Sequence, residues 1–489
     1  MSRAAPGDFL KTGLTFDDVL LVPKYSEIRS RKETLTTTRL TKDIALNIPI
    51  ISANMDTVTE ADMAVAMARE GGIGIIHRFM SLEEQASQVM KVKRTESILI
   101  EKPYTLSETA LVSDVKRLMS ERNVGGILIV SEAGKLKGIV TTRDIRFHED
   151  QSNVRAIDVM TKRNDLVVAP KKTSIKRALE IMQETKIEKL PLVDRDEKLA
   201  GLITAKDILK RKQFPNATKD AKGRLRVGAA IGVKGDFLER AKELVERVEA
   251  DCLVLDIAHG HSLHAIEAIS KIKKTIGKNV PLIAGNVATK EGAADLIKAG
   301  ADSIKVGVGS GSICITRIVT GSGVPQLTAI SDCSRIARDY GVTLIADGGI
   351  RNSGDITKSL VAGADTVMVG SLLAGTDESP GEIVYRGNYR YKVTRGMAST
   401  SARKDQLARE GKADEQQEDL GDYVAEGVEA IVPYKGGAVS VVRQLAGGLR
   451  SGLSYCGAGS LAELRKNAEF IRITEVGLKE SMPHDVKEL

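Results

Sequence analysis

Short apolar runs alternate with amphipathic segments along most of the chain. The runs end at Gly, Asp, Asn or a similar small polar residue, and the segments between them, such as Phe237–Val248 and Ala293–Lys298, carry apolar residues at helical spacing. Eight such runs occur, at 48–55, 73–77, 226–232, 252–260, 281–287, 303–309, 343–349 and 366–371. Eight strand–helix units predict an α/β fold, the TIM (β/α)8 barrel. A doubly wound open sheet is the alternative, but no GxGxxG motif opens a helix after the first run.

An internal repeat interrupts this alternation after the second predicted helix. Val115–Ile145 aligns without gaps to Ala178–Ile208, and each copy reads helix, strand, turn, strand and the start of a helix. Neither copy can bury its apolar face alone, so we expect the two copies to pack as a pseudo-symmetric pair. The sequence thus predicts a barrel in two parts, 1–94 and 215–489, separated by a tandem insert at 95–214 with copies at about 95–153 and 157–214.

Composition and charge narrow the class of protein. The 489 residues are enough for more than one domain, and the net charge of +7 suits anionic small ligands. No basic tract with interleaved aromatic residues is present, so we expect no nucleic-acid partner. The four cysteines form neither a disulfide framework nor a metal-ligand pattern, which indicates a reducing compartment. No signal peptide and no apolar run of membrane-spanning length is found, so the expectation is a soluble, cytoplasmic protein without a membrane partner.

The strongest chemical signal is the stretch GVGSGSICITR, from Gly307 to Arg317. Its glycines let the backbone take positive φ angles and present amide and carbonyl groups to a ligand. Cys314 comes where this loop turns toward a helix, a position that favours the nucleophilic thiolate. A buried structural cysteine is the alternative. The glycines on one side and the hydroxyl of Thr316 on the other favour catalysis.

Polar residues at the ends of the predicted strands would meet on one rim of the barrel, where TIM-barrel active sites form. They are Asn54, Asp256, Asn286, the Cys314 loop, Asp347 and Ser371. The last two runs end in Asp347-Gly348-Gly349 and Gly370-Ser371, turns whose N–H groups suit a phosphate. The pattern therefore predicts a phosphorylated ligand, and an FMN-dependent barrel oxidase remains an alternative.

A highly charged segment follows Arg395-Gly396-Met397. From Arg403 to Glu418 it is nearly free of β-branched residues, which is typical of a solvated surface loop. The functional interpretation is a mobile flap over the rim, at about 398–432. In that interpretation Glu426 faces the reacting centre beside Thr316 as a proton relay.

These motifs resemble the IMP dehydrogenase/GMP reductase family over nearly the whole chain, and the repeat resembles a tandem pair of cystathionine-β-synthase-type (CBS) domains. The supporting runs are LTFDDVLLVP at Leu14, NMDTVTE at Asn54, GSICITR at Gly311, DGGIRNSGDI at Asp347, VMVGSLLAGTDESPGE at Val367 and GGLRSGLSYCGA at Gly447. The resemblance implies a purine nucleoside monophosphate substrate, a nicotinamide cofactor, a monovalent cation (with potassium as the expected ion) and a homotetramer or octamer. It also implies ATP or GTP at the CBS pair, through Asp144 and Asp207.

The resemblance further implies a role for individual residues. Cys314 would attack C2 of the purine and form a covalent thioimidate, with Thr316 and Glu426 completing the catalytic set. The residues that would hold the nucleotide are Asn54, Ser312, Asp347, Gly348, Gly349, Gly370, Ser371, Arg395, Gly396, Met397 and Glu426. The residues that would line the dinucleotide site are Asp256, Ala258, Gly307, Val308 and Gly309. The cation would be held by Gly309, Gly311 and Cys314, with Glu480, Ser481 and Met482 from a neighbouring subunit, although Ser310 replaces the proline usual there.

The two branches of the family treat the thioimidate differently. Dehydrogenases oxidise IMP with NAD and then hydrolyse the intermediate, with the arginine of an Arg-Tyr pair on the flap as the base for water. Reductases expel ammonia from GMP and use NADPH, so they need no such base. Between Met397 and Glu426 this chain has no Arg-Tyr pair, because its one such pair, Arg390-Tyr391, precedes the flap.

Two further details, Ile257-Ala258 after Asp256 and the residue Asn54, also resemble reductases. The CBS insert is commoner among dehydrogenases, but an insert is more easily transferred than a catalytic base. We therefore predict an NADPH-dependent GMP reductase of the type that carries CBS domains, with IMP dehydrogenase as the alternative. A nucleotide sensor with an inactive barrel is the alternative from another class, and the intact Cys314, Thr316 and Glu426 set argues against it.

Overall fold

The computed structural model describes residues 11–95, 99–101, 103–146, 154–205, 213–277, 279–409, 423–483 and 486. The chain divides into two compact units. The first, here called the barrel unit, comprises residues 1–93, 216–220 and 225–489, and the second, the insert unit, comprises residues 94–215 and 221–224.

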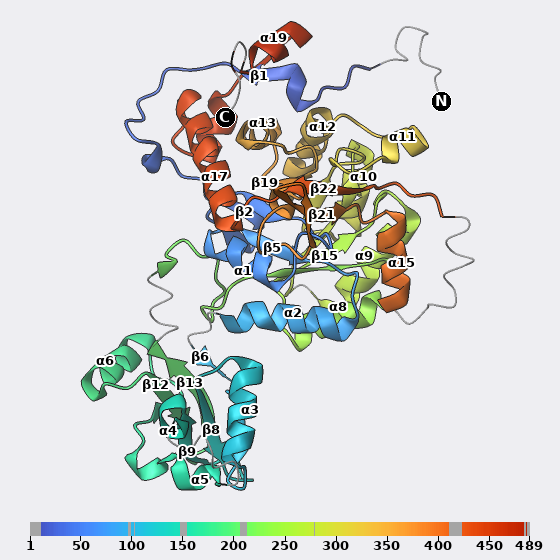
Figure 1. Ribbon diagram of the computed structural model, residues 1–489. Coiled ribbons are helices and arrows are strands. Elements are labelled where there is room, and N and C mark those ends of the chain that lie inside the picture. The colour runs from blue at the N-terminus through green and yellow to red at the C-terminus, as the bar shows by residue number, and fades with distance from the viewer. Residues whose placement is uncertain are drawn as a thin grey trace. The chain divides into compact units, whose positions relative to one another are not determined.

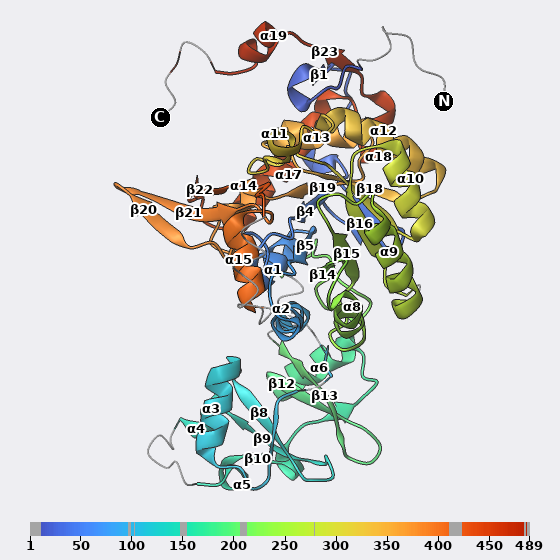
Figure 2. The same ribbon diagram turned by 90° about the vertical axis from the view of Figure 1, so that its right-hand side faces the viewer.

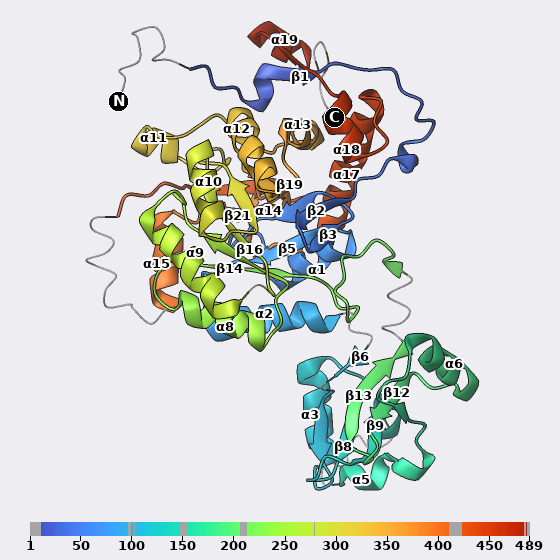
Figure 3. The ribbon, with the colours of Figure 1, turned by 180° about the vertical axis from the view of Figure 1, so that it is seen from behind.

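A closed barrel of eight parallel strands forms the centre of the barrel unit (Figures 1 and 3). Its strands follow one another around the barrel in chain order. They are β4 (Ile50–Ser52), β5 (Ile73–Ile76), β14 (Gly228–Ile231), β15 (Cys252–Asp256), β16 (Leu282–Val287), β17 (Ser303–Val306), β18 (Thr343–Asp347) and β19 (Thr366–Val369). Each lies inside one of the eight predicted runs, so the predicted TIM barrel is confirmed.

The strands read as continuous apolar runs because both of their faces are buried. In β15, Val254 belongs to the apolar cluster inside the barrel, while Leu253 and Leu255 belong to the larger cluster between strands and helices. The interior cluster also contains Ile51, Ile73, Ile75, Ala230, Ile283, Ile345 and Met368.

Helices cover the outside of the barrel (Figures 1 and 2). They are α1 (Ala61–Arg69), α2 (Leu82–Thr95), α8 (Phe237–Glu246), α9 (Leu263–Ile276), α10 (Lys290–Ala299), α12 (Gln326–Asp339), α13 (Ser353–Ala362) and α17 (Ala438–Tyr455). Helix α10 shows how the sequence sets their ends. The Thr289 side chain accepts a hydrogen bond from Gly292 N–H at its start, and Gly300, with φ of 116°, ends it.

The barrel unit also contains a three-stranded antiparallel sheet that is separate from the barrel. It is formed by β20 (Ile383–Arg386), β21 (Tyr389–Arg395) and β22 (Glu429–Pro433), and Figure 2 shows the β20–β21 hairpin extending away from the barrel strands. The pairing of β21 with β22 places Arg395 opposite Glu429, so the two ends of the predicted flap are fixed to each other.

The insert unit contains two four-stranded sheets of matching layout. One has the order β10-β9-β8-β7 and the other β11-β12-β13-β6. The first copy of the repeat supplies α3 (Val112–Arg122), β8 (Gly126–Val130), β9 (Leu136–Thr141) and α4 (Thr142–Ile145), and the second supplies α6 (Ile175–Thr185), β12 (Lys189–Val193) and β13 (Leu199–Thr204). The sheets are completed by β6 (Leu99–Ile100), β7 (Thr105–Ser107), β10 (Thr161–Lys162) and β11 (Ala169–Pro170).

Equivalent turns of the two copies contact each other. Leu136 N–H donates to the Glu197 carbonyl and Leu199 N–H donates to the Gly134 carbonyl, each at 3.1 Å. Leu136 and Leu199 occupy the same position in the two copies, and so do Gly134 and Glu197. The copies therefore pair across a pseudo-two-fold axis, and side chains of both contribute to a shared apolar cluster.

A buried ionic cluster lies where the chain leaves and re-enters the barrel unit. Lys93, at the end of α2, contacts Asp251 at 2.5 Å and Asp220 at 3.1 Å. Asp251 also accepts the Val227 N–H at 2.8 Å. Burial raises the pKa of the Asp251 carboxyl, and the Lys93 ammonium works against that rise. Lys93 thus compensates a buried carboxylate next to β14 and β15.

We expect Lys93→Met to destabilise the barrel unit by about 3 kcal/mol or more, because the buried Asp251 loses its nearest cation. Urea denaturation followed by circular dichroism measures the change in the free energy of unfolding. Lys24→Met is the matched control, since it breaks an exposed pair with Glu469 and should leave the midpoint of unfolding unchanged. Equal behaviour of the two variants would show that the cluster does not stabilise the fold.

Candidate active site

The loop between β17 and α11 (Thr316–Thr320) carries Cys314 and packs tightly on the end of β18. At Gly307 the φ angle is 150°, and a Cβ atom there would lie 1.9 Å from the Asp347 carbonyl oxygen. At Gly309 the φ angle is 71°, and a Cβ atom would lie 2.4 Å from Cγ of Arg317. Only glycine fits these two positions, so the predicted conformational role of the glycines is met here.

Two side chains donate hydrogen bonds to backbone carbonyls in and around this loop. Arg317 donates to the carbonyls of Val308 at 3.1 Å and Val324 at 2.6 Å. Gln326 donates to the carbonyls of Val306 at 2.9 Å and Asp347 at 3.2 Å. Arg317 and Gln326 were not predicted as site residues, because hydrogen bonds from a side chain to a distant backbone carbonyl leave no spacing pattern in the sequence.

Cys314, Thr316 and Glu426 form a connected chain of side chains. The Cys314 Sγ lies 3.1 Å from Thr316 Oγ1, and Thr316 Oγ1 donates to Glu426 Oε2 at 2.8 Å. The backbone makes this contact possible, because Cys314 forms an antiparallel bridge with Gly427 and Ile315 N–H donates to the Glu426 carbonyl at 2.8 Å. The structure therefore brings together the three residues predicted as catalytic.

The four cysteines, all of which the structure describes, differ sharply in environment. Cys252, Cys333 and Cys456 are buried, while Cys314 is partly exposed. Burial raises the pKa of each buried thiol, to about 12 for Cys333. These three are poor nucleophiles at neutral pH, so Cys314 is the one cysteine suited to attack a ligand.

Polar side chains from four neighbouring strands meet at the carboxyl end of the barrel. Lys305 of β17 contacts Asp347 of β18 at 2.6 Å and Asp256 of β15 at 3.3 Å. Asn286 of β16 donates to Asp347 Oδ2 at 2.9 Å and to the Gly307 carbonyl at 2.8 Å, and its own Oδ1 accepts from Lys305. Lys305 was missed as a site residue. The only sign of it in the sequence is one charged residue within an otherwise apolar strand.

The two predicted phosphate turns close the rim. Gly348 and Gly349 follow β18 with φ angles of 100° and 79°, and Gly370 caps the short helix α14 (Ser371–Ala374) after β19. A Cβ atom on Gly348 would lie 2.4 Å from Ser310 Oγ. Ser310 Oγ in turn donates to the Asp347 carbonyl at 3.2 Å. This hydrogen bond ties the loop to β18 at the position where the family usually has proline.

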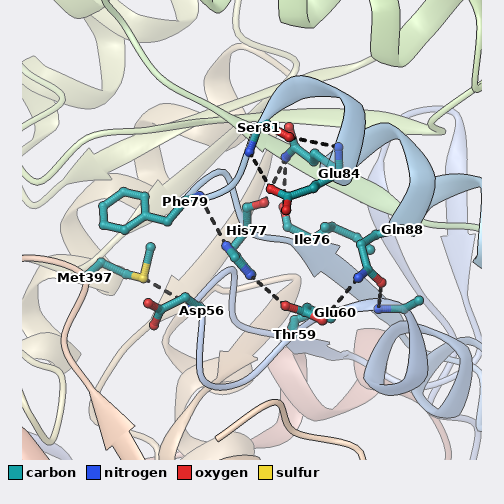
Figure 4. A network of polar contacts seen from close by, with 12 residues as sticks. Asp56, Thr59, Glu60, Ile76, His77, Phe79, Ser81, Glu84, Gln88 and Met397 are labelled. Carbon is teal, nitrogen blue, oxygen red and sulfur yellow. Dashed lines mark hydrogen bonds and ion pairs between the residues drawn. The ribbon is translucent and has the colours of Figure 1, made fainter. Parts of the chain in front are cut away.

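The Arg395–Met397 segment is attached to the loop that follows β4. The Arg395 guanidinium pairs with Asp56 at 2.6 Å and with Asp405 at 2.7 Å. The Asp56 N–H faces the Met397 sulfur at 3.3 Å, as the close-up shows (Figure 4). The contacts of Arg395 described here are thus with these two carboxylates, and the sequence analysis named neither. Asn54 lies in the same loop and is buried.

A second network orders the loops after β4 and β5 (Figure 4). The Phe79 N–H donates to His77 Nδ1 at 3.1 Å, so Nε2 carries the proton and faces Glu60 Oε1 at 3.4 Å. Gln88 donates to the other Glu60 oxygen at 3.2 Å and accepts from Ala61 N–H at 3.0 Å. His77 is fully buried, and this network fixes the first two rim loops against each other.

The predicted flap at 398–432 is described at both ends, and its centre, 410–422, lies outside the described residues. Its first part forms the helix α15 (Thr400–Arg409), on which Ala402, Gln406 and Leu407 are buried. This part is a packed helix and not a solvated surface loop, because three residues on one side of it are covered.

The remaining predicted residues stay predictions. Ser312 lies in the Cys314 loop and the exposed Ala258 lies in the loop after β15. Glu480 is the last residue of α19 (Glu475–Glu480), and Ser481 and Met482 follow it. The Gly311 carbonyl accepts the Cys314 N–H at 3.2 Å. Asp144 caps α4 by accepting Thr141 N–H and Oγ1, both at 2.7 Å, and Asp207 lies outside the described residues.

Within the described ranges no group of three or more His, Cys, Asp or Glu side chains is placed to hold a metal ion. No helix in the described part of the chain combines the length and apolar character needed to cross a membrane.

A closed (β/α)8 barrel with a part-exposed cysteine after its sixth strand, backed by a threonine and a glutamate, has the arrangement expected of an enzyme with a thiol nucleophile. Residues 13–484 match the model of the IMP dehydrogenase / GMP reductase domain. The chain is 56% identical to inosine-5'-monophosphate dehydrogenase of Nitrosopumilus maritimus, covering 97% of this chain and 99% of that one, and 54% identical to the Bacillus subtilis enzyme of the same name, covering 98% and 97%. A crystal structure of a GMP reductase variant from Trypanosoma brucei in complex with guanosine 5'-monophosphate superposes with a TM-score of 0.92 at 44% identity, covering 98% of this chain and 99% of that one.

The chain therefore belongs to the IMP dehydrogenase/GMP reductase family. It is an oxidoreductase of this family, which acts on purine nucleoside monophosphates with a nicotinamide cofactor.

We expect iodoacetamide at pH 7.5 to alkylate Cys314 in the native protein and to leave the other three cysteines unmodified, because their thiols are buried and have raised pKa values. Peptide mass spectrometry measures the labelling. Cys314→Ala is the matched control and should remain unlabelled until it is denatured. Rapid native labelling of Cys333 would contradict this assignment.

Proposed function

We propose that the protein is a GMP reductase, which converts GMP and NADPH with one proton to IMP, ammonia and NADP⁺. The observation that carries this proposal is the lack of an Arg-Tyr pair between Met397 and Glu426. A dehydrogenase must ionise a water molecule to hydrolyse its thioimidate, whereas a reductase has no such step.

The contacts of nearby arginines support the same choice. Arg395 is held between Asp56 and Asp405, and Arg317 is bound to two backbone carbonyls. Arg403, on α15, donates to Gln406 at 3.2 Å. Each of these three guanidinium groups is thus engaged in a contact of its own.

In the proposed reaction the Cys314 sulfur bonds to C2 of the purine while the C2–NH2 bond breaks and ammonia leaves. The hydrogen-bonded chain from Glu426 through Thr316 supplies the proton that the departing amine needs. The C2–S bond later breaks as C2 is reduced, which returns the thiolate. The glycine turns at 348–349 and 370, with Ser371, would hold the 5'-phosphate. Asp347 would accept hydrogen bonds from the ribose hydroxyls.

The residues of the predicted cofactor site fit a dinucleotide. Gly307 and Gly309 carry no side chain, and the Asp256 side chain, 19% exposed, keeps part of its carboxylate accessible for ribose hydroxyls. When bound, the nicotinamide would supply the two electrons that reduce C2. The carbonyls of Gly309, Gly311 and Cys314 would contribute to a potassium site, completed by Glu480, Ser481 and Met482 of a neighbouring subunit in a homotetramer or octamer.

The insert unit would act as a pair of CBS domains that bind ATP or GTP. The matching layout of its two sheets and the pseudo-two-fold pairing of its turns support this assignment. Asp144 and Asp207 occupy equivalent positions in the two copies and would contact the nucleotide ribose. Asp144 sits at the start of α4, within the first copy.

IMP dehydrogenase is the second candidate, and the curated relatives favour it. The two relatives described above carry that name and are more than half identical to this chain over nearly its whole length. The structural neighbour at 44% identity is instead a GMP reductase, so overall similarity does not decide between the two reactions.

A paired spectrophotometric assay distinguishes the candidates. We expect GMP with NADPH to cause a loss of the absorbance of the reduced nicotinamide. IMP with NAD⁺ should give at most a slow signal, because the flap has no Arg-Tyr pair to activate the water for hydrolysis. Cys314→Ala should abolish turnover, and Cys333→Ala is the matched control that retains it. Rapid formation of XMP from IMP would overturn the proposal in favour of the dehydrogenase.

The relay predicts a second result. Glu426→Gln keeps the size of the side chain but removes its proton-transferring carboxylate, so kcat with GMP and NADPH should fall by about 10²-fold or more. The KM for GMP should change much less. Glu429→Gln, in the neighbouring strand β22, is the control and should leave kcat unchanged. Equal activity of Glu426→Gln and wild type would exclude the relay.

A further inference from the structure

Lys305 is a buried ammonium group at the centre of the site, and the reaction described above assigns it no task. It lies in β17, whose four residues are all buried, and its side chain is only 3% exposed. A lysine without a partner at such a depth costs several kcal/mol, so its presence requires a compensating set of contacts.

The compensating contacts come from three other strands of the barrel, β15 and β16 before β17, and β18 after it. Lys305 donates to Asp347 Oδ2 of β18 at 2.6 Å, to Asp256 Oδ1 of β15 at 3.3 Å and to Asn286 Oδ1 of β16. Asn286 also donates to the Asp347 oxygen that Lys305 contacts, at 2.9 Å. One ammonium group thus connects two carboxylates on β15 and β18, which lie three positions apart in the barrel.

The two carboxylates differ from Lys305 in their access to ligands. The Asp256 and Asp347 side chains are 19% and 21% exposed. Burial lowers the pKa of Lys305, but Asp347 and Asp256 raise it by more, so the ammonium stays charged. One positive charge between two negative charges leaves both carboxylates able to accept hydrogen bonds from hydroxyl groups while limiting their mutual repulsion.

We propose that Lys305 is a positioning residue that couples the dinucleotide subsite at Asp256 to the nucleotide subsite at Asp347. The inference rests on the proposed function in assigning these two carboxylates to the two ligands, and it holds for either direction of redox chemistry. When a ligand engages one carboxylate, the shared ammonium and Asn286 are fixed for the other. Each ligand then raises the affinity of the protein for the other ligand by the same factor.

The test measures coupling rather than turnover. Calorimetry on the full-length protein gives the Kd for GMP alone and with saturating NADP⁺, and the same pair of measurements is made with IMP and NADH. Neither pair can react, because each lacks the oxidised or reduced partner that the reaction needs. We expect the dinucleotide to tighten wild-type binding of the monophosphate by about fivefold or more. In Lys305→Met the ratio of the two Kd values should fall to about one, and Lys305→Arg should restore part of it.

Lys392→Met is the matched control. Lys392 is also a buried lysine, but it donates to the carbonyls of Thr376 and Ser379 and contacts neither Asp256 nor Asp347 in the described structure. This variant should keep the wild-type ratio. A merely structural role for Lys305 would lower thermal stability and weaken both ligands while leaving the ratio unchanged.

The outcomes separate this inference from the proposed function. A coupling ratio that survives in Lys305→Met, or a wild-type ratio of one for both ligand pairs, overturns the role of Lys305. Should Lys305→Met not fold, Lys305→Arg and Asn286→Ala decide the question, because both change the network and each is expected to reduce the ratio. Turnover of IMP but not of GMP would instead overturn the proposed reductase, and the coupling would then be read from IMP and NADH.

Discussion

A single stretch of antiparallel backbone pairing determines whether this site can exist. Cys314 is positioned by the loop after β17, whereas Glu426 comes from the C-terminal part of the flap. The bridge between Cys314 and Gly427, together with the hydrogen bonds from Ile315 to Glu426 and from Val428 to Ile313, holds these two segments in register. Because side chains of adjacent residues point to opposite sides of such a pair, a slip by one residue would turn Glu426 away from Thr316.

The rim loops support this pairing from several directions. Arg395 joins β21 to the loop after β4 and to helix α15, and Asp56 contacts Met397 in the same region. Gln326 fixes the start of the Cys314 loop through the carbonyls of Val306 and Asp347. The backbone that carries the Cys314 thiol is therefore fixed by several hydrogen bonds. A nucleophile needs such preorganisation to meet its substrate in one geometry.

The sequence predicted the barrel well and the site in part, for physical reasons that differ. Strands such as β15 could be located because both of their faces are buried, which leaves a continuous apolar run. Cys314, Thr316 and Glu426 could be found from local motifs and from the family resemblance. Lys305 and Gln326 were not found, because their partners are carbonyls and carboxylates far away in the chain. Helix α15 was missed because only a few of its residues are buried and the rest is charged, as in a solvated loop.

The cluster around Lys93 has an implication for how the two units are joined. Lys93 is the last residue of the barrel unit before the insert, and Asp220 belongs to the segment by which the chain returns. That segment is also attached to the barrel by hydrogen bonds from Asn47 to the Asn216 carbonyl and from Thr218 to the Ala68 carbonyl. The segments by which the chain leaves and re-enters the barrel unit are therefore held together at one place. All eight barrel strands belong to the barrel unit, so the insert unit contributes none of them. Such a junction lets a module be gained, lost or exchanged in evolution while the enzyme core keeps its shape.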